Sequence, residues 1–104
     1  AEGWSGSALK TAKGHSVNLL AAAGARERGL LLTLQDLSNV GWAGIHAALL
    51  GARIPTLNGL ELNSPQFLPA ANAEWLPRLS GLFEPKGGVH EVPDPDAPGL
   101  GSGL

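Results

Sequence analysis

Cysteine and methionine are absent from this 104-residue chain, and aromatic residues make up only 5% of it. Without cysteine, neither a disulfide framework nor a thiolate metal site can form, and a reducing compartment such as the cytoplasm is favoured. Because the chain has no methionine and begins with Ala1, we expect it to be a piece of a longer polypeptide.

Long apolar runs and an excess of one charge are also missing. No run approaches the roughly 20 apolar residues that a membrane-spanning helix needs, and the first residues lack the pattern of a signal peptide. The formal net charge is −2, with acidic and basic residues scattered along the chain. This pattern indicates a soluble protein and lacks the basic surface typical of nucleic-acid or anionic-membrane binding, so we expect neither partner.

The length and the turn-forming residues bound the organisation of the chain. A chain of this length has room for one modest core, while 15 glycines and 8 prolines predict many turns. We predict a single unit, with βα repeats over residues 1–63 and an irregular region, a hairpin and a tail over residues 64–104.

Strand and helix patterns alternate in the first of these parts. Apolar character predicts three strands, at residues 7–11, 30–35 and 58–63. The second strand is a nearly continuous apolar run, which is typical of a strand covered on both faces. Two helices are predicted between the strands, at residues 16–28 and 41–50. The order favours repeated βα units with a parallel sheet.

The first predicted helix has an apolar stripe at helical spacing. Val17, Leu20, Ala21 and Gly24 recur at the interval that one face of a helix requires. We therefore predict that this stripe is the buried side of the helix.

Residues after Pro65 follow a different pattern. The stretch is rich in proline, with a short helix predicted at residues 70–75. Two alternating runs on either side of Lys86-Gly87-Gly88 predict a β-hairpin. The proline- and glycine-rich residues that follow predict an irregular tail.

Two architectures are compatible with this order of elements. A small doubly wound sheet uses parallel strands, but such folds normally have more than three. A (β/α)8 barrel has the same local rhythm and needs on the order of 250 residues, so this chain would be only part of one. We expect the α/β fold of a partial (β/α)8 barrel, with about three βα units followed by the hairpin and the tail.

Four stretches of the sequence carry a family resemblance, through both their wording and their order: LKTAKG, LLLTLQDLSNVGWAGIHAALLGA, GLELN and GVHEVPDPDAPGLGSGL. They resemble the last third of enolase-superfamily barrels, most closely those of the mandelate-racemase and muconate-lactonising branch. The resemblance implies about three of the eight strands of an enzyme that uses Mg²⁺ to abstract a proton beside a carboxylate. Racemases, epimerases, cycloisomerases and dehydratases of that family work in this way.

The resemblance implies a catalytic role for Lys10. In the muconate-lactonising type, the sixth strand ends in an LKxxK-like pattern, and its first lysine is the acid or base at the carbon beside the carboxylate. Lys10 falls on that position and Lys13 lies just beyond it. The sequence departs from the family at Gly14-His15, where two glycines are common. Without the resemblance, both lysines would be interpreted as solvated surface groups.

Other functional positions of the family fall outside this sequence or differ in it. The magnesium ligands of the family are acidic residues of the third, fourth and fifth strands, and none of those strands is expected here. At the end of the seventh strand, where the racemase type has a histidine, this chain has Gln35 and Asp36. This departure argues against the histidine branch and leaves Asp36 as a polar contact of the site.

Proton abstraction beside a carboxylate produces a costly dianion, which a metal ion and fixed positive groups have to stabilise. Lys10 alone cannot do this, and Lys13 would be a nearby cation that favours proton loss from Lys10. Asp36 directly follows an apolar strand, which places it at the mouth of a barrel. Alternatively, Asp36 caps the following helix together with Ser38 and Asn39.

The histidines form no recognisable metal motif. We expect His46 to be a partly buried structural ring in the second helix, while His15 and His90 are far apart in the sequence. Glu61 either faces a pocket or begins a loop. We therefore expect no metal ion or other cofactor on this chain, and Mg²⁺ only in the full-length parent.

Our prediction is a C-terminal barrel segment with Lys10, Lys13 and Asp36 as catalytic candidates and a small carboxylate as the substrate of the parent. The isolated chain is expected to be inactive. The alternative is a non-catalytic fragment or subunit. It would complete a barrel by binding the remainder of that barrel or by self-association, because three βα units leave strand edges and apolar helix faces exposed.

Overall fold

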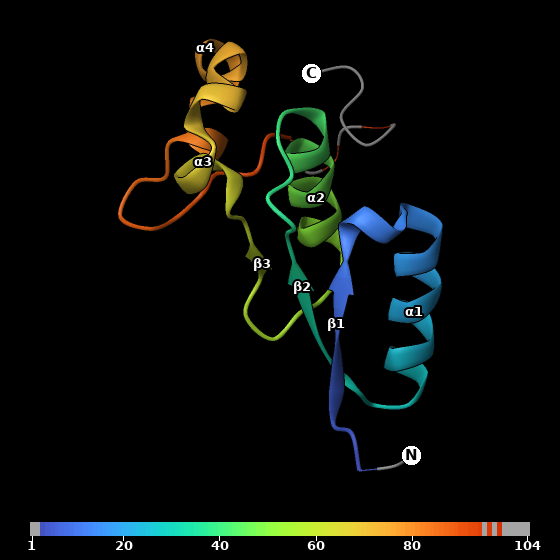
Figure 1. The fold of residues 1–104 in the computed structure, drawn as a ribbon. Helices are drawn as coiled ribbons and strands as arrows, with labels where there is room; N and C mark the ends of the chain where they lie inside the picture. The colour runs from blue at the N-terminus through green and yellow to red at the C-terminus, as the bar shows by residue number, and fades with distance from the viewer. Residues whose placement is uncertain (1–2, 95, 97, 99–104) are drawn as a thin grey trace.

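The computed structural model describes residues 3–94, 96 and 98. They form an α/β fold with the strands β1 (Gly6–Lys10), β2 (Leu31–Gln35) and β3 (Leu60–Glu61). These strands make one parallel sheet in the order β1-β2-β3, and their arrows point the same way in Figure 1. The predicted alternation of strands and helices is confirmed.

Both crossover helices cover the same face of the sheet. The helix α1 (His15–Glu27) follows one short turn of 3₁₀ helix, η1 (Thr11–Lys13). The helix α2 (Trp42–Arg53) joins β2 to β3. One hydrophobic cluster contains buried side chains of β1 and β2, of α1, and of α2 with the residue that follows it: Leu9, Ala25, Leu32, Leu34, Leu50 and Ile54. Strands in sequential order with crossovers of one hand place their helices on one side, so the sheet is wound in one direction.

Among the described residues, the other face of the sheet is largely uncovered. Side chains alternate along a strand, so the residues between the buried leucines point away from the helices. Ala8 is exposed, and the side chain of Leu31 is 54% exposed. We call this surface the open face; its residues are Ala8, Lys10, Leu31, Thr33, Gln35 and Glu61. The prediction that the second strand is covered on both faces is therefore wrong for the described residues.

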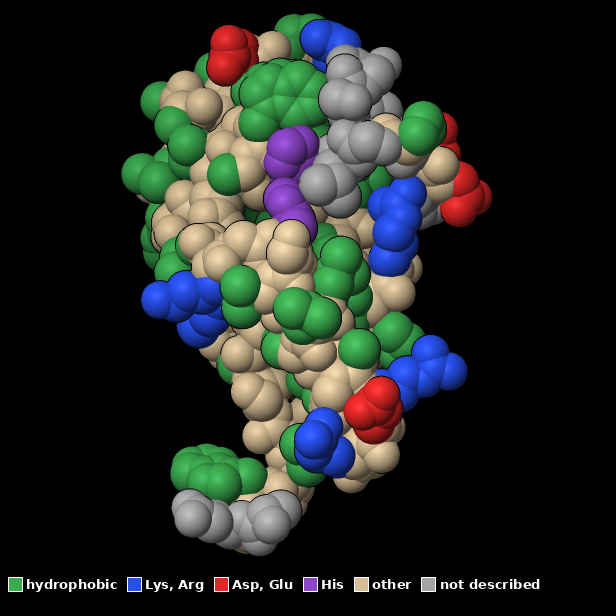
Figure 2. Space-filling model, turned by 90° about the vertical axis from the view of Figure 1, so that its right-hand side faces the viewer, with side chains coloured by type: hydrophobic (Ala, Val, Ile, Leu, Met, Phe, Trp, Pro, Cys, Tyr) green, Lys and Arg blue, Asp and Glu red, His purple; other side chains and the backbone are tan. Residues whose placement is uncertain are grey.

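The buried side of α1 differs from the predicted one. Val17 and Leu20 are 57% and 75% exposed, whereas Asn18 is buried. The Nδ2 of Asn18 donates hydrogen bonds to the carbonyls of Lys10 (2.8 Å) and Gly14 (2.7 Å), and these bonds fix the rotation of the helix. The predicted stripe is consequently turned outward, and exposed apolar side chains lie on the surface that carries α1 (Figure 2).

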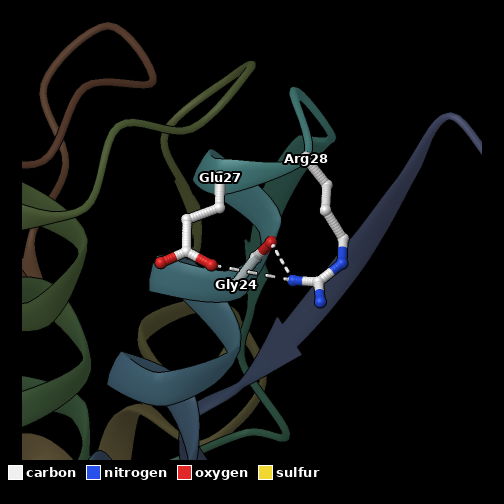
Figure 3. Close-up of polar contacts among 3 residues, drawn as sticks. All are labelled: Gly24, Glu27 and Arg28. Carbon is white, nitrogen blue, oxygen red and sulfur yellow. Dashed lines mark hydrogen bonds and ion pairs between the residues drawn. The ribbon is translucent and has the colours of Figure 1, made fainter.

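The C-terminal end of α1 is held by Arg28. Its Nη1 donates a hydrogen bond to the carbonyl of Gly24 (2.8 Å) and lies 4.0 Å from Oε2 of Glu27 (Figure 3). A guanidinium at this position satisfies one of the last carbonyls of the helix and lies at the negative end of the helix dipole. Both charged side chains are exposed, so the ion pair itself contributes little to stability.

Residues 64–83 are helical rather than irregular. The helix α3 (Ser64–Phe67), the 3₁₀ helix η2 (Pro69–Trp75) and α4 (Leu76–Phe83) follow β3 beyond the carboxyl end of the sheet (Figure 1). Of these, η2 and α4 pack on α2 through a second hydrophobic cluster, which contains Ile45, Ala48, Leu49, Trp75, Leu82 and Phe83. None of the helices formed by the described residues combines the length and the apolar character needed to cross a bilayer.

The predicted hairpin around Lys86-Gly87-Gly88 is wrong in its extent. Its first arm does not exist, because Leu82 and Phe83 end α4. A single antiparallel bridge joins Lys86 to Val89, with N–H···O bonds of 3.1 and 3.0 Å. Gly87 and Gly88, which lie between these two residues, have φ angles of 60° and 79°. This segment is therefore a tight turn. Most of the predicted tail lies outside the described residues.

Candidate functional site

A row of polar side chains crosses the carboxyl ends of the three strands on the open face. Lys10 pairs with Gln35 in the sheet register, and Gln35 pairs with Glu61. The leucine that precedes each of them points to the helices instead. Ligands of parallel α/β sheets bind at this edge, so the row marks the candidate site.

Lys10 is oriented by its neighbour in the row. Its Nζ donates a hydrogen bond to Oε1 of Gln35 at 2.6 Å, and the contact is partly buried. Because the amide of Gln35 is neutral, this bond directs the ammonium group without cancelling its charge. A lysine held in this way can present an acidic N–H, or a basic nitrogen after proton loss, to a molecule bound over the open face.

Lys13 is not part of the row. It ends η1 and is exposed. Among the described residues, Lys13 has no hydrogen-bonding or ion-pair partner through its side chain. Its predicted action on Lys10 stays a prediction.

Asp36 is buried, with 3% of its surface exposed. Its Oδ1 accepts a hydrogen bond from the backbone N–H of Asn39 (2.6 Å), and its Oδ2 accepts from the N–H groups of Asn63 (2.7 Å) and Ser64 (3.3 Å). The carboxylate therefore ties the turn after β2 to the start of α3. A direct catalytic role would require Asp36 to give up bonds that hold this edge together.

The alternative prediction, that Asp36 caps the following helix together with Ser38 and Asn39, is wrong. The N-cap of α2 is Gly41, which forms no side-chain cap and has a φ of 51°. The backbone N–H of Gly41 donates instead to Oδ1 of Asn72, a buried side chain of η2, at 2.8 Å. The start of α2 is thus held by a residue 31 positions further along the chain.

A chain of polar contacts links the loops after all three strands. The Nδ2 of Asn39 donates to Oγ1 of Thr11 at 2.7 Å, which connects the second loop to η1, and Asp36 connects it to the loop after β3. Sequence reasoning missed these contacts. Asparagine and threonine at or near the ends of predicted strands are a weak signal for such loops, but nothing local identifies partners that lie 27 or 28 residues away.

Two histidines meet on the helix side of the sheet. The ring centroids of His15 and His46 are 5.5 Å apart at an interplanar angle of 66°, and the ring of Trp42 lies 5.8 Å from that of His46. Figure 2 shows two histidine side chains side by side on the molecular surface. Burial, and secondly the positive charge that His15 can carry, lower the pKa of His46 from 6.5.

Comparison with known proteins adds no assignment, since no family model, curated protein or solved structure matches this chain. Within residues 3–94, 96 and 98, no group of three or more histidine, aspartate and glutamate side chains is placed to hold a metal ion. The functional inference therefore depends on the carboxyl edge of the sheet and on the sequence resemblance.

We expect Asp36→Asn to lower the free energy of unfolding by about 2 kcal/mol, because charge-assisted bonds are lost and an NH₂ group meets backbone N–H donors. Urea unfolding followed by circular dichroism measures this change. The matched control is Glu61→Gln at an exposed carboxylate, which should change stability by less than about 0.5 kcal/mol. Equal stability of the two variants would show that Asp36 does not hold the loops together.

We expect an NMR titration to give His46 a pKa below 6.5. Because the folded-state pKa is lower than the unfolded one, protonation of His46 opposes folding. Its contribution therefore reduces stability as the pH falls from about 6.5 through the folded-state pKa, and it disappears at higher pH. His15→Gln removes one of the two causes and should raise the pKa of His46. A pKa of 6.5 or above in the unmodified chain would contradict the observed burial.

Proposed function

We propose that this chain is the C-terminal section of an enolase-superfamily (β/α)8 barrel and that Lys10 moves a proton at the carbon beside a carboxylate. The observation that carries the proposal is the position of Lys10. It is the last residue of β1, on the open face, at the carboxyl edge of a parallel sheet. Active sites of barrel enzymes are built at this edge of the strands. The sequence resemblance supplies the reaction class.

The winding of the sheet supports a barrel section. In a closed barrel all helices lie outside the ring, and the inner face of each strand faces other strands. A doubly wound fold would instead need helices on both faces. Here α1 and α2 share one face, and the small side chains of Ala8 and Thr33 lie on the other. The outward stripe with Val17 and Leu20 would lie against a neighbouring element of the parent.

The described residues do not by themselves fit a magnesium site. Mg²⁺ requires oxygen ligands in near-octahedral geometry. Among the described residues, Glu61 is the only carboxylate of the open face. The nearby Asp36 has both oxygens bonded to backbone N–H groups. The Oε1 of Gln35 accepts a bond from an ammonium group. The ligands must therefore come from strands outside this chain, and we expect the isolated chain to be inactive.

In this proposal Gln35 is a positioning residue that orients Nζ of Lys10. A lysine ammonium has three N–H donors, and its neutral amine still has two. The carbonyl oxygen of Gln35 can therefore accept a bond from Lys10 in both protonation states. This keeps Nζ at one position whether it delivers a proton or removes one. The substrate would be a small carboxylate bound over the open face, and a chain without cysteine is consistent with a cytoplasmic enzyme.

The proposed proton transfer can be tested on the complete polypeptide that contains this chain. With Mg²⁺ in D₂O, a panel of small α-hydroxy and α-amino carboxylates is followed by ¹H NMR for exchange of the α-proton. Lys10→Met should reduce exchange by about 100-fold or more, because the group that transfers the proton is removed. Lys86→Met, at an exposed lysine in the turn after α4, should leave it unchanged.

Both negative results are informative in that experiment. Exchange at an unchanged rate in Lys10→Met would refute the role of Lys10. Absence of exchange with every carboxylate in the unmodified protein would refute the reaction class. Circular dichroism of each variant establishes that the fold is retained.

A second candidate function, completion of a barrel by association, is favoured by the open face itself. The central strand β2 exposes Leu31 there, and backbone edges of the sheet are available for pairing. A non-catalytic subunit would use this surface to bind the remainder of a barrel or a second copy of the chain.

We expect Leu31→Glu to weaken self-association of the isolated chain by at least about tenfold, since burying an unpaired charge on β2 is costly. Analytical ultracentrifugation over a concentration series measures the effect. Leu57→Glu is the matched control, because Leu57 is 67% exposed but lies in the loop before β3, outside the open face. An unmodified chain that stays monomeric, or equal weakening by both substitutions, would refute self-association through the open face.

A further inference from the structure

A second polar site lies on the helix side of the sheet, opposite to the row that contains Lys10. His15, at the start of α1, and His46, in α2, line one small cavity of about 130 Å³. Thr11, Asn39 and two alanines complete its lining. Neither histidine has a part in the proposed reaction, so the cavity needs an explanation of its own.

The spacing of the two rings suits ligation of one metal ion. A ligating histidine nitrogen lies about 2.0–2.1 Å from Zn²⁺, so two rings on one tetrahedral ion have centres about 5 Å apart. The centroids of His15 and His46 are 5.5 Å apart, close to that value. The rings meet edge to face at 66°.

The size of the cavity selects an ion rather than an organic molecule. Pockets for small molecules have volumes of about 300–1,000 Å³, whereas 130 Å³ holds a metal ion with a few waters, each of about 30 Å³. Asn39 is fixed by its backbone bond to Asp36 and by the bond from its Nδ2 to Thr11. No described residue donates a hydrogen bond to its Oδ1, which could therefore bind an ion or a metal-bound water.

The chemistry of the lining selects the kind of ion. Imidazole is a preferred ligand of Zn²⁺, Ni²⁺ and Cu²⁺, whereas Mg²⁺ prefers carboxylate and water. No carboxylate lines this cavity among the described residues. The neutral ring is the form that ligates a metal.

We propose that His15 and His46 form a two-histidine site for a transition-metal ion of the Zn²⁺, Ni²⁺ and Cu²⁺ type, with water completing the coordination. The proposal differs from the sequence-based expectation that this chain binds no metal ion. It is independent of Lys10 and of Mg²⁺, because none of the open-face residues lines the cavity.

Isothermal titration calorimetry with Ni²⁺ at pH 7.5 tests this site on the 104-residue chain. We expect one ion per chain and no competition from excess Mg²⁺. His15→Gln and His46→Gln should each weaken Ni²⁺ binding by about tenfold or more, since a single imidazole remains. His90→Gln is the matched control, because His90 contacts the carbonyl of Leu82 (2.6 Å) and does not line the cavity.

A second measurement does not depend on the folding of the variants. Titration of the unmodified chain with diamagnetic Zn²⁺ should shift the imidazole resonances of His15 and His46 together, and leave those of His90 in place. Absence of Ni²⁺ binding, binding that survives in both pair variants, or an equal loss in His90→Gln would overturn the proposal.

Discussion

The buried carboxylate of Asp36 is the constraint on which the carboxyl edge of the sheet depends. Removing a charge from water costs several kcal/mol unless hydrogen bonds replace the lost hydration. Asp36 obtains these bonds from backbone N–H groups of two different loops, which are thereby held against the end of β2. The contact between Asn39 and Thr11 includes the first loop as well. The three loops are consequently fixed relative to one another, and so are the residues that precede them.

The division of the apolar contacts explains how a chain with an uncovered sheet face can still be folded. One cluster lies between the sheet and the helices α1 and α2, and a second joins α2 to the C-terminal helices. The residues of the open face, such as Ala8 and Gln35, belong to neither cluster. The fold therefore does not draw its main hydrophobic stabilisation from the open face. Among the described residues, that surface remains uncovered around Lys10.

Sequence patterns predicted the elements of the first 63 residues because βα units are encoded by local periodicity. They failed where side-chain hydrogen bonds decide the outcome. The stripe of Val17 and Leu20 has ideal helical spacing, yet the bonds from Asn18 to two carbonyls turn it outward. The position of Lys10 on a strand end was predictable, because strand and terminus are local. The bonds of Asp36 were not, since two of its three partners lie 27 and 28 residues away.

The row of Lys10 and the histidine cavity are joined by one short turn, although they lie on opposite sides of the sheet. Asn18 binds the carbonyl of Lys10, and Asn39 binds the hydroxyl of Thr11, the next residue. The turn is thus held on the side of α1 and on the side of the β2 loop. An ion between the histidines would cross-link α1 and α2 next to this turn. Because the turn is already held at both residues, such an ion would stabilise the fold without moving Nζ of Lys10.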